Sequence, residues 1–258
     1  MVDSESVVRE LRGAGCVFAE EEARLLVSAA RDPGELRAMV DRRVAGTPLE
    51  HVLGWVEFCG ARVVVEPGVF VPRRRTEFLV RTAVAAAGPD ARVVVDLCCG
   101  SGAVGAAVHS ALGRAELHAV DVDPAAVRCA RRNIDGRVHE GDLYEPLPAE
   151  LRGRVDVLVA NAPYVPSGAI GSMPREARDH ERRIALDGGA DGLRVQRRVA
   201  AGAPGWLAPG GRLLVETGER QAAGLAEVFA DAGLEPEVVR SEEADCTVVV
   251  GSRDAGAR

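Results

Sequence analysis

The feature of this chain that most constrains its fold is a glycine-rich turn directly after an apolar run. Residues 94–105 read VVDLCCGSGAVG, and the last six letters satisfy the pattern G-x-G-x-x-G. In parallel α/β sheets such a turn joins a strand to a helix, and the missing side chains let a ligand approach the backbone at the helix N-terminus. The turn therefore predicts a nucleotide or nucleoside ligand, but the glycines alone do not say which one.

Strand-like and helix-like segments alternate around this turn from residue 76 onward. The strand-like runs lie at 92–97, 115–121, 155–160, 211–217 and 245–250. The helix-like segments lie at 77–87, 103–112, 124–133, 191–203 and 220–232. This alternation is typical of a doubly wound α/β sheet. With 258 residues and 47% hydrophobic content, the chain is long enough for one such domain and a smaller one.

The N-terminal part of the chain has a different pattern. Apolar residues recur at helical spacing over 4–45, and breaks rich in Gly and Pro divide this stretch into two or three short helices. From residue 46 to residue 72, β-branched runs and turn signals indicate a β-hairpin that links the two domains. We therefore predict a small helical domain, a hairpin linker, an α/β domain and a C-terminal tail, over 1–46, 47–75, 76–251 and 252–258.

Carboxylates at the ends of two consecutive strands indicate which ligand the turn holds. Asp96 lies four positions before Gly100, where it would repel the pyrophosphate of a dinucleotide but attract the ammonium and sulfonium groups of S-adenosylmethionine. Asp121 ends the next strand and would accept hydrogen bonds from the ribose of either ligand. The alternative is that both carboxylates only cap the following helices. The charges favour S-adenosylmethionine and count against NAD.

A third strand leads directly into the tetrapeptide Asn161-Ala162-Pro163-Tyr164. Asn161 and the backbone carbonyl that follows it offer two hydrogen-bond acceptors, and Pro163 stiffens the turn. Such a turn can hold a planar NH2 group and aim its nitrogen at a methyl donor, while Tyr164 packs against the plane of the substrate. The alternative is an ordinary turn with a core tyrosine.

Composition narrows the class of protein further. The net charge is −7 and no basic block is present, so there is no electrostatic argument for binding nucleic acid or an anionic membrane. No apolar run reaches about 18 residues, and the N-terminus is too polar for a signal peptide, which predicts a cytoplasmic protein. The six cysteines and five histidines lack metal-ligand spacing, so we expect no metal.

Four segments read VPRRRTEFLV at 71–80, NAPYVP at 161–166, ALDGGADGLRVQRRV at 185–199 and LLVETGERQ at 213–221. Together they resemble the HemK/PrmC family of protein-(glutamine-N5) methyltransferases. The resemblance runs from about residue 46 to residue 250. It implies methylation of the Gly-Gly-Gln glutamine of peptide chain release factors with S-adenosylmethionine. It also implies a Rossmann-like class I methyltransferase fold of about seven mostly parallel strands, preceded by a helical domain that docks the release factor.

The resemblance also implies roles for individual residues. Asn161, Ala162, Pro163 and Tyr164 would hold the substrate amide. The cofactor would be bound by Asp96, Cys98, Cys99, Gly100, Ser101, Gly102, Asp121 at the ribose, Asp142 and Leu143 at the adenine, and Asn161. Within this set we expect Gly102 to serve close approach of the ligand, so that a bulky residue there blocks binding without unfolding the protein.

The sequence departs from the family pattern at several places. The usual NPPY has Ala162 at its second position, and the usual PRPxTE has Arg74 at its third. Arg182 stands where a proline normally follows a glutamate, and the helical part is shorter than in typical members. The chemistry is therefore better supported than the substrate.

Other functions therefore stay open beside the release factor. The acceptor could be an adenine NH2 group of nucleic acid or a small molecule with an NH2 group. An NAD-dependent oxidoreductase and a cofactor-binding scaffold without turnover are further alternatives. For the methyltransferase we expect a monomer with a release factor as partner, no stable binding to nucleic acid and no membrane association.

Overall fold

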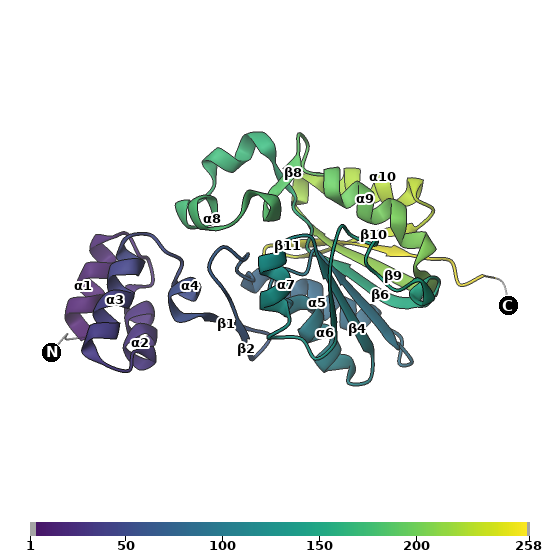
Figure 1. Cartoon of the computed structure of the whole chain (residues 1–258). Coiled ribbons are helices and arrows are strands. Elements are labelled where there is room, and N and C mark those ends of the chain that lie inside the picture. Colours follow the sequence, from purple (N-terminus) through teal and green to yellow (C-terminus); the bar gives the residue numbers. More distant parts are fainter. Residues whose placement is uncertain (1–3, 257–258) are drawn as a thin grey trace.

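The computed structural model describes residues 4–256, and it begins with three short helices (Figure 1). These are α1 (Ser4–Gly13), α2 (Ala19–Ala29) and α3 (Pro33–Val44). The Asp32 side chain caps α3 by accepting a hydrogen bond from the Glu35 amide at 2.9 Å. The three helices enclose an apolar cluster of their own, which includes Val7, Leu11, Leu26 and Val40.

A fourth helix and a hairpin connect these helices to the rest of the chain. Helix α4 (Leu49–Leu53) lies where we expected the hairpin to begin, and Gly54 ends it with a left-handed φ of 80°. The sequence pattern missed this helix because it is one turn long, yet its Val52 is buried in the N-terminal cluster. The hairpin follows as β1 (Trp55–Phe58) and β2 (Ala61–Val64), which pair antiparallel.

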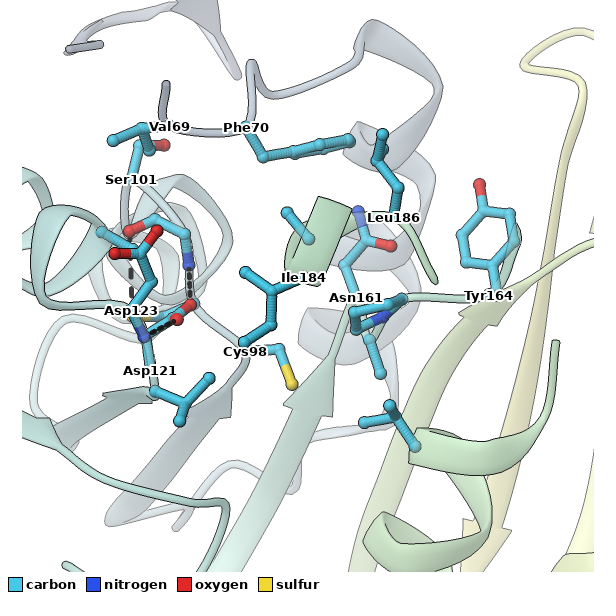
Figure 2. Close-up of a pocket in the computed structure, with 18 of the residues that line it drawn as sticks. Val69, Phe70, Cys98, Ser101, Asp121, Asp123, Asn161, Tyr164, Ile184 and Leu186 are labelled. Carbon is cyan, nitrogen blue, oxygen red and sulfur yellow. Dashed lines mark hydrogen bonds between the residues drawn. The ribbon is translucent and has the colours of Figure 1, made fainter. Parts of the chain in front are cut away.

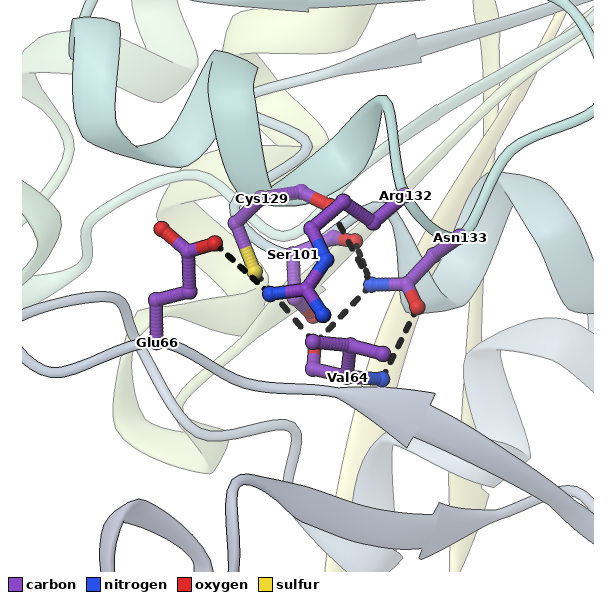
Figure 3. A network of polar contacts seen from close by, with 6 residues as sticks. All are labelled: Val64, Glu66, Ser101, Cys129, Arg132 and Asn133. Carbon is purple, nitrogen blue, oxygen red and sulfur yellow. Dashed lines mark hydrogen bonds and ion pairs between the residues drawn. The ribbon is translucent and has the colours of Figure 1, made fainter.

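One asparagine attaches the hairpin to the α/β domain. Asn133 accepts a hydrogen bond from the amide of Val64 and donates to its carbonyl, at 2.8 and 2.9 Å (Figure 3). The same side chain donates to the carbonyl of Ser101 in the glycine-rich turn at 2.8 Å. Arg132 pairs with Glu66 beside it at 3.0 Å. The linker is therefore fixed directly to the turn that forms the predicted cofactor site.

The central sheet has seven strands in the order β10-β11-β9-β6-β3-β4-β5. The strands are β3 (Val93–Leu97), β4 (Glu116–Asp121), β5 (Arg137–Glu140), β6 (Val155–Ala160), β9 (Leu207–Thr217), β10 (Glu235–Ser241) and β11 (Cys246–Ser252). Only β11 runs opposite to the other six strands, since it pairs antiparallel with both β10 and β9, so the expected mostly parallel sheet is confirmed. The periodicity missed β5 and β10 because both are edge strands without a buried apolar pattern.

Helices cover both faces of this sheet, as Figure 1 shows. They are α5 (Glu77–Ala86), α6 (Ala103–Leu112), α7 (Pro124–Ala130), α9 (Arg194–Gly202) and α10 (Ala222–Asp231). Val93 and Val95 of β3 pack in the cluster under α9 and α10, whereas Val94 packs in the cluster under α5 and α6. This alternation is the period of two expected of a strand buried on both faces.

A long excursion separates β6 from α9, and we call residues 167–186 within it the rim segment. It contains η3 (Ser167–Ser172), α8 (Arg175–His180) and η4 (Arg183–Ala185), between the short paired strands β7 (Val165–Pro166) and β8 (Asp187–Gly189). Arg43 of α3 forms an ion pair with Glu176 of α8 at 2.7 Å. The remaining short helices are η1 (Arg74–Thr76), η2 (Ala149–Leu151), η5 (Ala203–Gly205) and η6 (Glu219–Gln221). Over residues 4–256, no helix has the length and apolar character that crossing a bilayer requires.

Candidate functional site

A cavity of about 390 Å³ lies at the carboxyl ends of β3, β4 and β6, between these strands and the rim segment (Figure 2). In open α/β sheets this edge is where ligands bind, and the volume suits a small molecule. Every predicted site residue except Gly102 lines the cavity. The strand order therefore brings together turns that are separated by more than 60 residues along the chain.

Asp121 connects the first two of these turns. One of its carboxylate oxygens accepts a hydrogen bond from the amide of Gly100 and the other from the amide of Asp123, both at 2.9 Å. Figure 2 shows both contacts at the edge of the cavity. Burial raises the pKa of Asp121, while these backbone hydrogen bonds act in the opposite direction. Within residues 4–256 no cationic side chain pairs with it.

Asp96 lies deeper, at the end of β3. Its carboxylate accepts a hydrogen bond at 2.8 Å from the amide of Gly105, the third residue of α6. The helix-capping alternative is thus correct in part, because Asp96 satisfies a free amide of the helix start. Asp96 also lines the cavity, and its burial raises its pKa to about 7.

The structure shows a packing constraint at Gly102 that the sequence did not predict. This glycine does not line the cavity; it precedes α6 with a left-handed φ of 82°. A Cβ atom there would lie 2.6 Å from Cδ1 of Ile134 and 3.2 Å from Cβ of Ala130. The missing side chain therefore allows close packing in the core, and we correct the expectation that a bulky residue would leave the fold intact. At Gly100, by contrast, an added Cβ atom would meet no atom within 4 Å.

The remaining cofactor positions line the same end of the cavity. Asp142 pairs with Arg198 of α9 at 2.7 Å, and Leu143 adopts a positive φ of 49°. Burial raises the pKa of the Cys98 and Cys99 thiols well above the usual range. Both cysteines are therefore protonated at neutral pH, which makes them unsuitable as nucleophiles.

The acceptor turn follows β6 at the other end of the cavity. The amide nitrogen of Asn161 donates a long hydrogen bond of 3.5 Å to Oγ1 of Thr76. Its carbonyl oxygen accepts no hydrogen bond from residues 4–256, and Asn161 lines the cavity together with Ile184 and Leu186 (Figure 2). Ala162 is fully buried against the core, so alanine fills the apolar position that the family usually gives to proline.

Tyr164 is held by polar contacts that the sequence did not reveal. Its hydroxyl donates to Glu216 of β9 at 3.1 Å and accepts from Arg75 at 2.8 Å. Burial raises the pKa of this phenol, so it stays neutral. The carbonyl of Tyr164 accepts a hydrogen bond from Gln221 at 2.9 Å.

Several other residues at the cavity were missed by the sequence analysis. They include five apolar residues of the linker and the rim segment, namely Val69, Phe70, Met173, Ile184 and Leu186. Their positions follow from tertiary packing. Of these five, only Leu186 lies in a segment that resembles the family, 185–199, and that segment carried no assigned role.

Comparison with known proteins identifies the family. The model of a protein family described as "Methyltransferase small domain" matches residues 60–175 of this chain. A release factor glutamine methyltransferase of Geobacter sulfurreducens is 39% identical over 210 residues, which cover 78% of this chain and 72% of that protein. The chain belongs to the release factor glutamine methyltransferase family. The resemblance found in the sequence is thereby confirmed, and this family member is an enzyme that depends on S-adenosylmethionine.

Another relative of this family member is named for a different activity. A 4-amino-L-phenylalanine/4-methylamino-L-phenylalanine methyltransferase of Streptomyces pristinaespiralis is 36% identical over 249 residues, which cover 87% of this chain and 85% of that protein. Among solved structures, a T. thermophilus 16S rRNA methyltransferase in complex with AdoMet and guanosine has a TM-score of 0.56 at 20% identity, covering 77% of this chain and 49% of that chain. That structure shows the fold alone, and the expected class I methyltransferase fold is confirmed.

The cavity of this methyltransferase fits the cofactor that the family requires. S-adenosylmethionine carries a cationic ammonium and sulfonium besides its ribose hydroxyls. Asp96 and Asp121 both line the cavity, and their only hydrogen-bond partners in residues 4–256 are backbone amides. Asp96 is buried and Asp121 is half-buried. Two such carboxylates without a cationic partner are acceptors suited to a cationic ligand.

Proposed function

We propose that this enzyme methylates the side-chain amide of a protein glutamine, namely the Gly-Gly-Gln glutamine of a peptide chain release factor. The observation that carries the proposal is the carbonyl oxygen of Asn161, which lines the cavity without a partner in the described chain. An NH2 group is the donor that such an oxygen accepts. Two relatives at 39% identity are named release factor glutamine methyltransferase, which supports this acceptor. Release factors act in the cytoplasm, so the proposal includes a cytoplasmic location.

The chain's own residues contribute to catalysis chiefly by positioning the acceptor NH2 group. S-adenosylmethionine, when bound, supplies an electrophilic methyl group on a positively charged sulfur. Asn161 and the carbonyl of Ala162 would accept the two hydrogens of the acceptor NH2 group, and Pro163 restrains the turn that carries them. The new N–C bond forms as the S–C bond breaks, and the nitrogen then loses one proton to solvent. Alignment of the acceptor nitrogen with the methyl group supplies most of the rate enhancement, because an amide nitrogen is a weak nucleophile.

We assign the cofactor to the carboxylates of Asp96 and Asp121 and to the turn formed by Cys98, Cys99, Gly100 and Ser101. Asp142 and Leu143 would lie at the adenine. The proposal needs a single copy of the chain, since every assigned residue comes from it. Gly102 belongs to the same turn, and we keep it as a proposed contact through its backbone, with an added side chain excluded by Ile134.

Loss of the Asp121 carboxylate should weaken cofactor binding. We expect Asp121→Ala to make the free energy of S-adenosylmethionine binding less favourable by about 1.5–3 kcal/mol, the scale of hydrogen bonds to a charged group. Calorimetric titration measures this change. Glu140→Ala is the matched control, because Glu140 pairs with Asp121 in register at the end of β5 but does not line the cavity. Equal affinity of the two variants would contradict the ribose assignment.

Cofactor binding should also depend on pH through Asp96. Its pKa of about 7 in the free protein lies above its ordinary value of 3.8, so Asp96 carries a proton at low pH. A cationic ligand favours the carboxylate, and binding then releases that proton. We expect the affinity for S-adenosylmethionine to rise about tenfold between about pH 5.5 and pH 7.5. Asp96→Asn should flatten this dependence; an unchanged slope in the variant would assign the proton to another group.

We further propose that residues 1–46 dock the protein acceptor, that 47–75 link this domain to the catalytic domain over 76–251, and that 252–258 are a tail. The apolar cluster of α1 to α3, which is separate from the clusters of the central sheet, supports a distinct helical domain, and Val52 of α4 at the start of the linker packs into it. Val17 and Phe18, between α1 and α2, expose 84% and 69% of their surface and offer an apolar contact for a protein.

A second candidate function is methylation of a small aromatic amine. The relative from Streptomyces pristinaespiralis favours it, because that alignment includes most of both chains. The apolar side chains of Phe70, Met173 and Ile184 line the cavity and suit a planar ring. An aryl NH2 group would meet the same acceptor oxygen of Asn161.

One experiment separates these acceptors. The enzyme is incubated with labelled S-adenosylmethionine and, in parallel, with an intact release factor, its isolated Gly-Gly-Gln peptide, 4-amino-L-phenylalanine and an adenine-containing oligonucleotide. Transfer to the intact factor with a lower KM than to the peptide supports the release factor and the docking domain. Preferred transfer to 4-amino-L-phenylalanine establishes the second candidate. Transfer only to the oligonucleotide contradicts both proposals.

A further inference from the structure

The three consecutive arginines before α5 have three different environments. Arg73 lies over the ring of Phe70 at 4.9 Å and pairs with Glu181 of the rim segment at 2.5 Å. Arg74 is exposed and makes no ion pair within residues 4–256. Arg75 is directed to Tyr164, the last residue of the acceptor turn. The sequence run is therefore not a uniform basic surface.

Arg75, Tyr164 and Glu216 form a closed triangle of polar contacts. Nη2 of Arg75 donates to the Tyr164 hydroxyl at 2.8 Å, and Nε of Arg75 lies 3.5 Å from Oε1 of Glu216. The same Glu216 oxygen accepts the Tyr164 hydroxyl proton at 3.1 Å. Each group thus touches the other two, which fixes both the position and the hydrogen-bond direction of the phenol.

The buried carboxylate of Glu216 is the reason why losing Arg75 from this triangle should be energetically costly. Glu216 is the second-last residue of β9, and only 2% of its side chain is exposed. Its Oε2 atom is buried without a hydrogen-bond partner in the described chain. A buried carboxylate needs a counter-charge, and Arg75 is the only cation that the structure pairs with it among residues 4–256.

We propose that Arg75 and Glu216 are positioning residues that hold Tyr164, and through it the acceptor end of the cavity, in the geometry for methyl transfer. The inference rests on the proposed function for the role of the acceptor turn. Thr76 supports it, since this next residue contacts the Asn161 amide. Adjacent residues of η1 thereby reach both ends of the turn.

Arg75 also lines the cavity, so direct contact with the acceptor is the rival explanation. A double-mutant cycle separates the two. If Arg75 acts through Tyr164, Arg75→Met lowers kcat by about 10- to 100-fold in the native enzyme but much less in the Tyr164→Phe background. If Arg75 binds the acceptor itself, the full loss persists in that background, and the proposal is wrong.

Two further variants guard against a merely structural effect. Glu216→Gln keeps the volume and the acceptor oxygen but removes the charge, and we expect it to lower kcat about 10-fold with the KM for S-adenosylmethionine nearly unchanged. Arg74→Met is the matched control in the same run and should keep native kcat. Equal losses in Arg74→Met and Arg75→Met would overturn the assignment.

A spectroscopic measurement tests the positioning without any acceptor. The chain has two tyrosines, so isotope-labelled tyrosine gives two sets of ring signals in NMR spectra, and Tyr164→Phe identifies one of them. Arg75→Met and Glu216→Gln should both shift the Tyr164 signals, whereas Arg74→Met should not. Unshifted signals would disprove the positioning role even if a release factor is methylated. Shifted signals support it even if the true acceptor is another molecule.

Discussion

Asn161→Ala is expected to lower kcat by about 10²- to 10³-fold, the cost of deleting one preorganised polar contact to the reacting group. The free carbonyl oxygen of Asn161 is the atom that would hold the acceptor NH2 group, while its own NH2 group is bound by Thr76. The affinity for S-adenosylmethionine should fall much less. Single-turnover kinetics and calorimetry measure the two quantities separately.

Asn161→Asp is the sharper comparison. It keeps an acceptor oxygen in nearly the same volume, and the Thr76 hydroxyl can donate to it in place of accepting. We expect Asp to retain about tenfold more activity than Ala, which corresponds to about 1.4 kcal/mol of transition-state stabilisation. If Asp proves as inactive as Ala with the fold intact, the donor or the neutrality of Asn161 is what matters. Full activity of both variants would remove the acceptor turn from the mechanism.

Gly102→Ala should strongly reduce folding stability. Two costs add at this position: a left-handed φ of 82°, worth about 1–2 kcal/mol for a residue with a side chain, and overpacking against Ile134, worth about 1–3 kcal/mol. We therefore expect the free energy of unfolding to fall by about 2–5 kcal/mol. Urea unfolding monitored by circular dichroism measures it.

The other end of the same helix supplies the control. Gly113 follows α6 with a left-handed φ of 71°, but an added Cβ would meet no atom within 4 Å. Gly113→Ala should therefore show the conformational cost alone. Equal destabilisation of the two variants would mean that Ile134 moves aside at no cost. A weaker affinity for S-adenosylmethionine at unchanged stability in Gly102→Ala would restore the role in ligand approach that the sequence suggested.

The elements that sequence analysis predicted correctly share a local signal. The strands ending at Asp96 and Asp121 are buried on both faces and give continuous apolar runs, so their positions could be recognised without any structure. The edge strand β10 has an exposed surface and gives no such run. Helix α4 is one turn long, and it is stabilised by the burial of Val52 against helices from elsewhere in the chain.

The candidate site divides in the same way. The carboxylates and the Asn161 turn each follow a strand, and because parallel strands end at one edge, their meeting could be foreseen. The role of Gly102 could not, since its neighbour Ile134 comes from a different β-α unit. Arg75 could be read only as part of a basic run.

The sequence by itself therefore determined the fold class, the methyl donor and the turns that form the cavity, because each depends on residues that are near one another in the chain. Tertiary structure alone decided how the acceptor end is held. Arg75 and Thr76 lie 89 and 85 positions before the residues they contact in the acceptor turn. No periodicity extends over such distances, and only the packing of α5 beside β6 and β9 brings these side chains within hydrogen-bonding range.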